Sequence, residues 1–271
     1  MPLAVIPTPV GNLGDMSARA LETLAEADII ACEDTRVSGP LLRHFGISAP
    51  LISYYAHNER QRTEQLLSML QEGKKVALIS DAGTPGISDP GAEIIRRCID
   101  EGIGVTVLPG PTDFVPALVM SGLKAHPFLF YGFLPDRAGE REKVLTDLAS
   151  LDCTLVFYVS PHKAERHIRH SASLLGNRKA ALVREISKIY EEARRGTLEE
   201  LARSVAEGVR GELVLVVEGA SPQKAEEGEW KKAALEMIEA GVSSREVVKI
   251  LSKEYGLSKN EIKSFLFAPE A

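Results

Sequence analysis

The chain has 271 residues, of which 44% are hydrophobic and 26% charged, and its formal net charge is −6 at pH 7. This length predicts about two domains, at roughly 150 residues each. No apolar run approaches the ~20 residues that a membrane-spanning helix needs, and no charged leader is visible, so we expect a cytoplasmic protein that does not bind membranes. The acidic balance excludes indiscriminate binding to polyanions, so a nucleic-acid partner must meet a local basic patch.

Strand-like and helix-like patterns alternate through the first 118 residues. Strands are predicted within 4–10, 28–35, 51–57, 74–80 and 105–111, and helices over 16–27, 59–73 and 89–102. Gly73 and Gly102 follow two of the helical runs and predict their ends. The alternation implies an α/β domain over residues 1–118, with a mostly parallel sheet covered by helices.

A second α/β series begins at the sequence FLFYGFLP and predicts another domain over residues 123–220. Its strands are expected within 128–135, 153–159, 179–186 and 211–219, and its helices around 141–151, 161–175 and 198–207. The connection between 186 and 198, which contains Arg194 and Arg195, is expected to be a loop.

The last part of the chain follows a polar, acidic connector, SPQKAEEGE, and predicts a small helical subdomain over residues 224–271. Three short helices are expected, with Ser244 and Ser258 as N-caps and Gly241 and Gly256 as helix stops. Trp230 is expected to anchor the core of this subdomain rather than to stack on a base.

The three cysteines, Cys32, Cys98 and Cys153, lie far apart in apolar stretches without a CxxC spacing. This pattern is typical of buried thiols in a reducing compartment. We therefore expect neither a disulfide nor a metal site.

The loops that follow the strands of the first domain are rich in Gly, Pro and acidic residues. They read PTPVGNLGD, EDTR, AHNE, DAGTPGISDPG and PGPTDF in chain order. Any one of them alone is explained by a tight turn. In an open parallel sheet, however, all five meet at the carboxyl edge, where ligands bind. Together they predict one wall of a ligand cleft.

The usual phosphate-binding and hydrolytic motifs are absent from the sequence. There is no GxGxxG after the first strand, no GxxxxGK[ST], no HExxH and no GxSxG. Backbone polar groups and carboxylates without a phosphate clamp suit a zwitterionic nucleoside cofactor better than a nucleoside triphosphate.

The motifs PTPVGNLGD, ADIIACEDTR, LISDAGTPGISDPG, VLPGPTDF, GFLP, SPHK and GELVLVVEG occur in an order and spacing that resemble one protein family. This is the ribosomal RNA small subunit methyltransferase I family, of the tetrapyrrole methylase superfamily. The resemblance covers about residues 3–220. DAGTPGISDPG, GFLP and EDTR distinguish the ribosomal branch from porphyrin-methylating relatives.

The resemblance implies two α/β domains of the tetrapyrrole methylase type with the cofactor cleft between them. It further implies 2′-O-methylation of a cytidine ribose in the decoding region of 16S rRNA, with S-adenosylmethionine as cofactor. The implied partners are 16S rRNA or the assembled small ribosomal subunit, and a second copy in a homodimer. The tail resembles the helix-turn-helix appendage of some members. Two alternatives are a tetrapyrrole C-methyltransferase and a non-catalytic RNA-binding assembly factor.

Matching the family's motifs residue by residue implies a set of cofactor contacts. These are Pro9, Val10, Gly11, Asp81, Ala82, Gly83, Thr84, Pro109, Gly110, Pro111, Phe133, Leu134, Tyr158, Leu182 and Gly211. Three departures from the family pattern are Gly86 in place of Leu, Thr112 and Asp113 in place of Ser and Ala, and Val159 in place of Glu. Asp113 adds a negative charge either near the sulfonium or at a helix N-terminus.

The implied chemistry asks the protein to align the ribose oxygen, exclude water and accept one proton. Glu33, Asp34, His57 and Glu59 are candidate general bases at strand ends. We expect Asp34 and His57 to take part in catalysis, with Arg36 placed to hold a phosphate or orient a carboxylate. Alternatively, Asp34 and Arg36 pair as a structural corner. For Glu33 a structural role is favoured.

Cationic side chains that could contact RNA phosphates cluster outside the first domain. The expected RNA-binding residues are Arg137, Arg141, Lys163, Arg166, Arg245, Lys249 and Lys253. Lys163, Arg166, His167 and His170 recur at a helical spacing and would share one face. An ordinary solvated face is the alternative.

Overall fold

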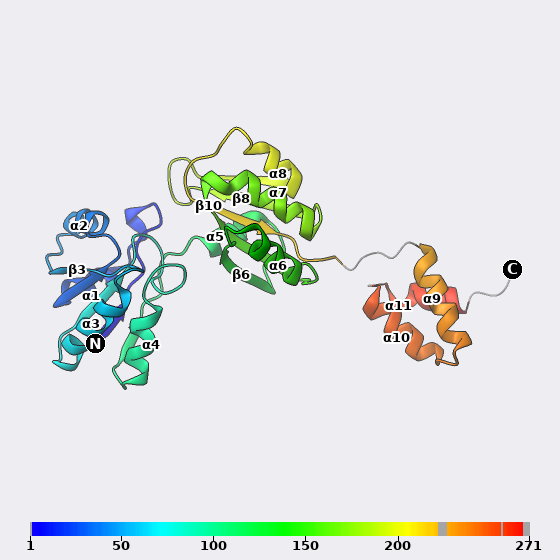
Figure 1. Cartoon of the computed structure of the whole chain (residues 1–271), viewed down its shortest axis with the longest axis horizontal. Helices are drawn as coiled ribbons and strands as arrows, with labels where there is room; N and C mark the ends of the chain where they lie inside the picture. The colour runs from blue at the N-terminus through cyan, green and yellow to red at the C-terminus, as the bar shows by residue number, and fades with distance from the viewer. Residues whose placement is uncertain (1, 222–226, 256, 268–271) are drawn as a thin grey trace.

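The computed structural model describes residues 2–221, 227–255 and 257–267. A first sheet, whose strand β3 is labelled in Figure 1, has the strand order β3-β2-β4-β1-β5, and all of its neighbouring strands are parallel. Its strands are β1 (Leu3–Val5), β2 (Ile29–Cys32), β3 (Leu51–Ser53), β4 (Val76–Ile79) and β5 (Val105–Val107). The predicted parallel sheet is confirmed.

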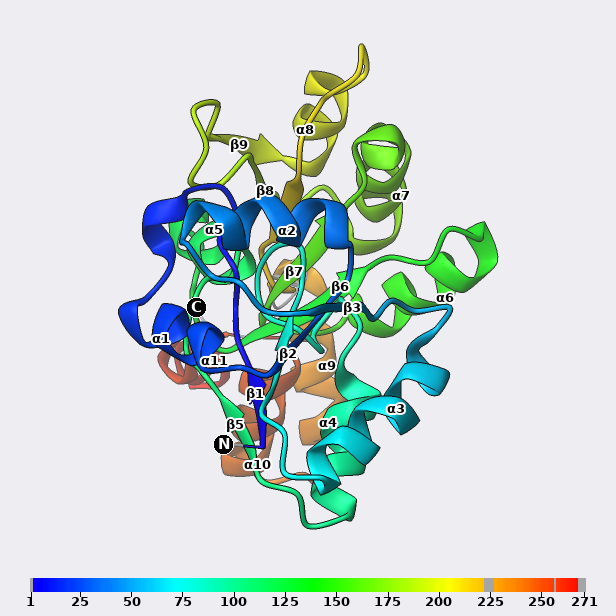
Figure 2. The same cartoon turned by 90° about the vertical axis from the view of Figure 1, so that its left-hand side faces the viewer.

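Helices cover both faces of the first sheet, as Figure 2 shows. They are α1 (Ala18–Ala25), α2 (Thr35–His44), α3 (Glu59–Gln71) and α4 (Ala92–Asp100). Along β1, Leu3 and Val5 face α3 and α4, whereas Ala4 faces α1 and α2. Successive strand side chains point to opposite faces, so each strand contributes to both cores.

Helix α2 replaces the loop that was expected after β2. It begins at Thr35, and Asp34 caps it by accepting a hydrogen bond from the Arg36 backbone N–H at 2.8 Å. Gly39 and Pro40 lie inside the helix, and both residues lower helix propensity in a sequence pattern. Tertiary packing overrides that preference, because Leu42 is buried against the sheet.

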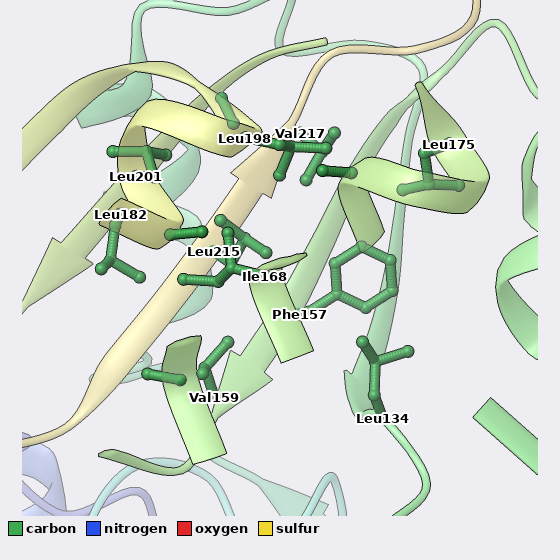
Figure 3. Close-up of a cluster of buried hydrophobic side chains, with 14 of the residues drawn as sticks. Leu134, Phe157, Val159, Ile168, Leu175, Leu182, Leu198, Leu201, Leu215 and Val217 are labelled. Carbon is green, nitrogen blue, oxygen red and sulfur yellow. The ribbon is translucent and has the colours of Figure 1, made fainter. Parts of the chain in front are cut away.

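The second sheet has the order β6-β7-β10-β8-β9, in which β6 and β7 are parallel and the other pairs are antiparallel. Its strands are β6 (Phe128–Phe133), β7 (Thr154–Val159), β8 (Lys179–Arg184), β9 (Glu192–Thr197) and β10 (Leu213–Val217). Helices α6 (Ala138–Leu148), α7 (Ala164–Leu175) and α8 (Leu198–Ser204) pack on one face, around Phe157, Leu182 and Leu215 (Figure 3).

The expectation of a loop around Arg194 and Arg195 is wrong, because both residues lie in strand β9. The sequence EARRGT has no apolar alternation, so its pattern resembles a loop. An edge strand needs only one backbone partner, here β8, and charged side chains are common on such edges.

Helix α5 (Phe114–Ser121) packs on the other face of the second sheet. Its Ala117 and Leu118 are buried with Val156, Val214 and Val216. The predicted division at residue 118 therefore falls inside a helix that belongs, by its packing, with the second sheet.

The tail contains α9 (Glu227–Glu239), α10 (Ser244–Glu254) and α11 (Lys259–Leu266), with a hydrophobic cluster of their own. Trp230 is 2% exposed, and its ring lies 5.1 Å from that of Phe265, which confirms its role as a core anchor. Ser258 caps α11 as expected, but α10 is capped by Ser243 and not by Ser244. Gly256 lies outside the described residues.

Cys32 and Cys98 are buried and Cys153 is half-buried, and all three are free thiols. Among the helices of the described residues, none is both long and apolar enough to cross a bilayer. Within the same residues, no group of His, Cys, Asp and Glu is arranged to hold a metal ion.

Candidate cofactor-binding site

The loops at the carboxyl edge of the first sheet are tied to one another by hydrogen bonds. Thr8 and Gly83 exchange two backbone hydrogen bonds, at 2.9 and 3.0 Å, between the loops after β1 and β4. Thr84 Oγ1 donates to the Pro111 carbonyl at 3.2 Å, which adds the loop after β5. The Asp34 N–H donates to Asp81 Oδ1 at 3.2 Å, which adds β2. The Gly91 N–H donates to Glu59 Oε1 at 3.0 Å, which adds the loop after β3, so all five predicted loops converge.

A cavity of about 660 Å³ lies between this edge and the second sheet. Loops of the first sheet contribute Val10, Glu33, residues 81–84, residues 87–89, Thr112 and Asp113. The second sheet contributes Phe133, residues 158–161, Glu185, Lys188 and residues 211–213. Because β10 is antiparallel to β7 and β8, its start lies at the same edge as their ends. Both sheets thus point one edge into the cavity.

Acidic side chains dominate the charge of this cavity. Its walls contain six carboxylates, those of Glu33, Asp81, Asp89, Asp113, Glu185 and Glu212. The one basic side chain among the residues that line it is Lys188, whose Nζ lies 3.1 Å from Glu185 Oε1 and 2.9 Å from Glu212 Oε2. The remaining four carboxylates have no cationic partner in the cavity wall, which favours a positively charged ligand.

Burial raises the pKa of Glu33, Asp81 and Asp89 above the usual carboxyl range. Repulsion between neighbouring carboxylates adds to the effect, since the negative charges of Asp89 and Asp81 further raise the pKa of Glu33. A cation bound among these groups would stabilise their ionised forms and reverse part of the shift.

Glycine allows close packing at the cavity, between the two sheets at Gly11 and within the second sheet at Gly211. A Cβ on Gly11 would lie 2.6 Å from the carbonyl oxygen of Ile186, in the loop after β8. Gly211 has a φ of +91°, and a Cβ there would collide with the Glu185 side chain. A larger residue at Gly11 would push the loop after β1 away from the loop after β8, and one at Gly211 would displace the Glu185 side chain from its place in the cavity wall.

Comparison with known proteins identifies the family. The profile described as Tetrapyrrole (Corrin/Porphyrin) Methylases matches residues 2–202. Ribosomal RNA small subunit methyltransferase I of Bacillus subtilis is 40% identical over 268 residues, which cover 96% of this chain and 92% of that protein. The protein of the same name from Synechocystis is 44% identical over 223 residues, 82% of this chain and 80% of that protein. The chain belongs to the ribosomal RNA small subunit methyltransferase I family of tetrapyrrole methylases.

Solved structures of other tetrapyrrole methylases share the fold. A cobalt precorrin-4 methyltransferase superposes with a TM-score of 0.59 at 19% identity, covering 79% of this chain and 93% of its own. Uroporphyrin-III C-methyltransferase from Thermus thermophilus superposes with a TM-score of 0.58 at 21% identity, covering 80% and 92%. At these identities the likeness concerns the fold alone, and it confirms the expected fold class.

Members of the methyltransferase family take the methyl group from S-adenosylmethionine. The cavity suits this cofactor in two respects. Its volume lies within the range of about 300 to 1,000 Å³ that is typical of small-molecule sites. Its carboxylates complement the positive charges of the cofactor's sulfonium and amino groups.

Most of the residues expected to contact the cofactor lie around this cavity. Those in its wall are Val10, Asp81, Ala82, Gly83, Thr84, Phe133, Tyr158 and Gly211. Pro9 and Gly11 line an adjoining cavity of about 440 Å³, which shares Val10, Asp81 and Ala82 with the first. Pro109, Gly110 and Pro111 line neither cavity, but Pro111 supports Thr84 through its carbonyl.

The expected side-chain contacts of Leu134 and Leu182 with the cofactor are corrected, because neither residue lines the cavity. They are 4% and 2% exposed and belong to the hydrophobic cluster beneath α6, α7 and α8. Side chains alternate along β8, and the face that Leu182 occupies is the helix-covered one. A motif match fixes a position in the chain but not the direction of its side chain.

The three expected catalytic residues are not brought together in the cavity. Asp34 and Arg36 form a bidentate pair, with Nη2 to Oδ2 at 2.6 Å and Nε to Oδ1 at 3.0 Å, which matches the structural-corner alternative. His57 is exposed in the loop after the edge strand β3 and does not line the cavity, although Glu59 of the same loop accepts a hydrogen bond from the Gly91 N–H. Their catalytic roles stay predictions.

Several residues of the cavity were not expected from the sequence. Glu33 was assigned a structural role, yet it lines the cavity, and Asp89, Glu185, Lys188 and Glu212 were not considered. Asp89 belongs to the DAGTPGISDPG loop, which the sequence had already indicated as part of the ligand cleft, so Asp89 could have been predicted to line the cavity. Lys188 lies in the connection between β8 and β9, and its approach to the first sheet depends on long-range packing.

The expectation that Arg141 contacts RNA is corrected, because its side chain is buried. It is 3% exposed, and its guanidinium donates to His170 Nδ1 at 2.8 Å and to the carbonyls of Pro135 and Asp136. It therefore clamps α6, α7 and the preceding loop together. His167 is also buried, so the proposed helix face is interrupted.

The other expected RNA-binding residues differ in their surroundings. Lys163 Nζ pairs with both carboxylate oxygens of Asp136, at 2.5 and 2.6 Å. Arg137 is exposed and pairs with Glu140 at 3.1 Å. The remaining exposed residues are Arg166, Arg245 and Lys249, and the side chain of Lys253 lies outside the described residues.

Proposed function

We propose that the protein transfers the methyl group of S-adenosylmethionine to the ribose 2′-oxygen of a cytidine in the decoding region of 16S rRNA. Membership of the family supports methyl transfer, and the names of the curated relatives support ribosomal RNA of the small subunit as the substrate. Such a substrate would place the reaction in the cytoplasm.

The observation that carries the proposal is the acidic cavity between the two sheets. A bound S-adenosylmethionine supplies an activated methyl group, which needs no further activation by the protein. Val10 and the 81–84 loop would hold it from the first sheet, and Phe133, Tyr158 and Gly211 would hold it from the second. The chain's remaining tasks are to orient the ribose, exclude water and take up its proton.

Glu33 is the side chain best suited to accept the ribose proton. It lines the cavity, and burial raises its pKa, which brings a carboxylate closer to the pH at which a general base works best. Asp34, the next residue, points to Arg36, and the hydrogen bonds from Arg36 lower its pKa to about 2. We therefore infer that Glu33, and not Asp34, accepts the proton.

We also propose that the protein works as a homodimer. Val115 and Val119 of α5 are 42% and 70% exposed, and Phe128 of the edge strand β6 is 40% exposed. The rings of Phe114 and Phe130 stack at 4.3 Å, so these two elements form one surface. A second copy covering this surface would remove its apolar side chains from water. Light scattering after size exclusion would contradict this proposal if it gave the mass of one chain.

The function is tested with small ribosomal subunits from a strain that lacks the gene. Purified enzyme and S-adenosylmethionine should add one methyl group to a cytidine ribose, and mass spectrometry of nuclease digests of the 16S rRNA locates it. A methyl group on a base, or none at all, would contradict the proposal. Calorimetry without detectable binding of S-adenosylmethionine would favour an RNA-binding assembly factor. Methylation of a tetrapyrrole in place of RNA would favour the C-methyltransferase.

A further inference from the structure

A second cavity, of about 500 Å³, lies beside the cofactor cavity on the second sheet. It is lined by His162, Arg184, Arg194 and residues 207–210. Arg194 lies opposite Leu182 in the β8–β9 pairing, so both arginines share the sheet face that α7 and α8 cover. The remaining walls are the short 3-10 helix η2 (Pro161–Lys163) and the loop between α8 and β10.

The two cavities share one wall. Three pairs of consecutive residues contribute one member to each side: Pro161 and His162, Glu185 and Arg184, and Gly211 and Arg210. In each pair the first residue lines the cofactor cavity and the second lines this one. The two binding spaces are therefore separated by the thickness of a single strand end or turn.

The charge of the second cavity is opposite to that of the first. Arg184 Nε and Arg194 Nε both donate to the Glu192 carboxylate, at 2.7 and 2.9 Å, and Arg194 Nη1 donates to the Ser204 carbonyl at 3.0 Å. One carboxylate thus orients two guanidiniums. Arg210 is exposed and makes no hydrogen bond or ion pair within the described part of the chain.

The balance of these charges leaves the cavity positive. Three guanidiniums, those of Arg184, Arg194 and Arg210, stand against the carboxylates of Glu192 and Glu207. Counting His162 as neutral, the net charge of these groups is therefore +1. A phosphodiester carries one negative charge, and guanidinium groups bind phosphate oxygens through paired, charge-assisted hydrogen bonds.

We propose that this basic cavity binds a backbone phosphate of the substrate RNA, next to the nucleotide that is presented to the cofactor cavity. The proposal rests on the proposed function, since it assumes an RNA substrate. The acidic cavity would attract the cationic cofactor and repel the RNA backbone, while the basic cavity would anchor that backbone on the other side of the shared wall. Opposite charges on the two sides of one wall thereby orient the substrate relative to the methyl donor.

Arg210→Gln tests the site in the full-length protein, and Arg203→Gln is its matched control. Arg203 is an exposed residue of α8 that does not line the cavity, and its replacement changes the net charge equally. The affinity for a fluorescently labelled single-stranded RNA of the decoding region is measured by anisotropy at several salt concentrations. Arg210→Gln should weaken binding by about tenfold and reduce the slope of log K against log salt by about one.

Glu207→Gln should act in the opposite direction and strengthen RNA binding, an outcome that misfolding cannot imitate. The affinity for S-adenosylmethionine should stay unchanged in all three variants. Equal affinities and salt slopes for Arg210→Gln and Arg203→Gln would overturn the proposal, even if the wild-type enzyme methylates the ribosomal subunit. Conversely, binding that depends on Arg210 in a protein that methylates no RNA would support this site and remove the proposed function.

Discussion

The carboxylate of Asp113 accepts a hydrogen bond from the Tyr158 hydroxyl, and this pair joins the loop after β5 to strand β7 of the other sheet. Asp113 stands at the N-cap position of α5 but makes no side-chain capping bond. Burial, followed by the bond to Asp113, raises the pKa of Tyr158, so this hydroxyl stays a donor at physiological pH. The pair therefore holds a carboxylate in place in the wall of the cofactor cavity.

Tyr158→Phe should weaken binding of S-adenosylmethionine by about tenfold, because a hydrogen bond to a charged group is worth about 1.5 to 3 kcal/mol. Isothermal titration calorimetry measures the change. Tyr131→Phe is the control, since that hydroxyl lies on the neighbouring strand β6 and is partly exposed. If both variants bind as the wild type does, the pair has no part in cofactor binding.

Gly83→Val should impair cofactor binding more than it impairs folding. Gly83 has a φ of +81° and lines the cavity, so a branched side chain there is strained and projects toward the ligand. Gly46→Val introduces comparable strain at a φ of +69°, where nothing lies within 4 Å of the added carbon. Both variants should melt at a lower temperature, but only Gly83→Val should lose affinity. A folded Gly83→Val protein with wild-type affinity would contradict the assigned cofactor site.

The affinity for S-adenosylmethionine should rise with pH across the range just above the usual carboxyl pKa. Burial raises the pKa values of Glu33, Asp81 and Asp89 in the free protein, and a cationic ligand favours their ionised forms. Binding therefore releases protons at low pH, and the affinity levels off once the three groups are ionised. Titrations between pH 4.5 and 8 in buffers of different ionisation enthalpy measure both effects. Asp81→Asn should reduce the pH dependence, and an unchanged profile would argue against an ionised Asp81 in the site.

Glu33→Gln should lower kcat for ribose methylation by about 10² to 10⁴, the usual range for a lost general base, and should leave the RNA concentration at half-maximal rate nearly unchanged. Asp34→Asn should keep most of the activity and lower the melting temperature only slightly, because a helix cap is weakened and not removed. Single-turnover rates and thermal melting separate the two outcomes. The reverse order of activities would restore Asp34 as the catalytic carboxylate.

Deletion of residues 223–271 should spare binding of S-adenosylmethionine and weaken engagement of the small ribosomal subunit. The tail has its own hydrophobic cluster around Trp230, and no side chain of residues 2–221 belongs to that cluster. Exposed Arg245, Lys249, Lys259 and Lys263 provide cationic side chains for contacts with RNA phosphates, beside the exposed carboxylates of Glu236, Glu239, Glu246 and Glu261. Methylation of subunits at the full rate by the truncated enzyme would show that the tail has another use.

The sequence by itself determined the class of the fold and the edge of the first sheet at which the cavity lies. In the first domain, buried strands such as β2 and β4 are continuous apolar runs that alternate with helices, which is typical of a parallel sheet; the similar alternation in the second domain did not reveal that most of its strand pairs are antiparallel. Once the sheet is parallel, the loops after β1, β2, β4 and β5 meet at one edge. Pattern and connectivity therefore suffice for these features, because they are set by local periodicity and by general rules of chain topology.

Only the tertiary structure decided which side chains line the cavity. Glu33 and Asp34 are neighbours with the same chemistry, yet one lines the cavity and the other pairs with Arg36. His57 lies outside the cavity wall, in the loop after the edge strand β3, and Arg141 is buried because α6 packs against α7. Strand order and side-chain direction depend on contacts between residues that are distant in the chain, and no local pattern records them.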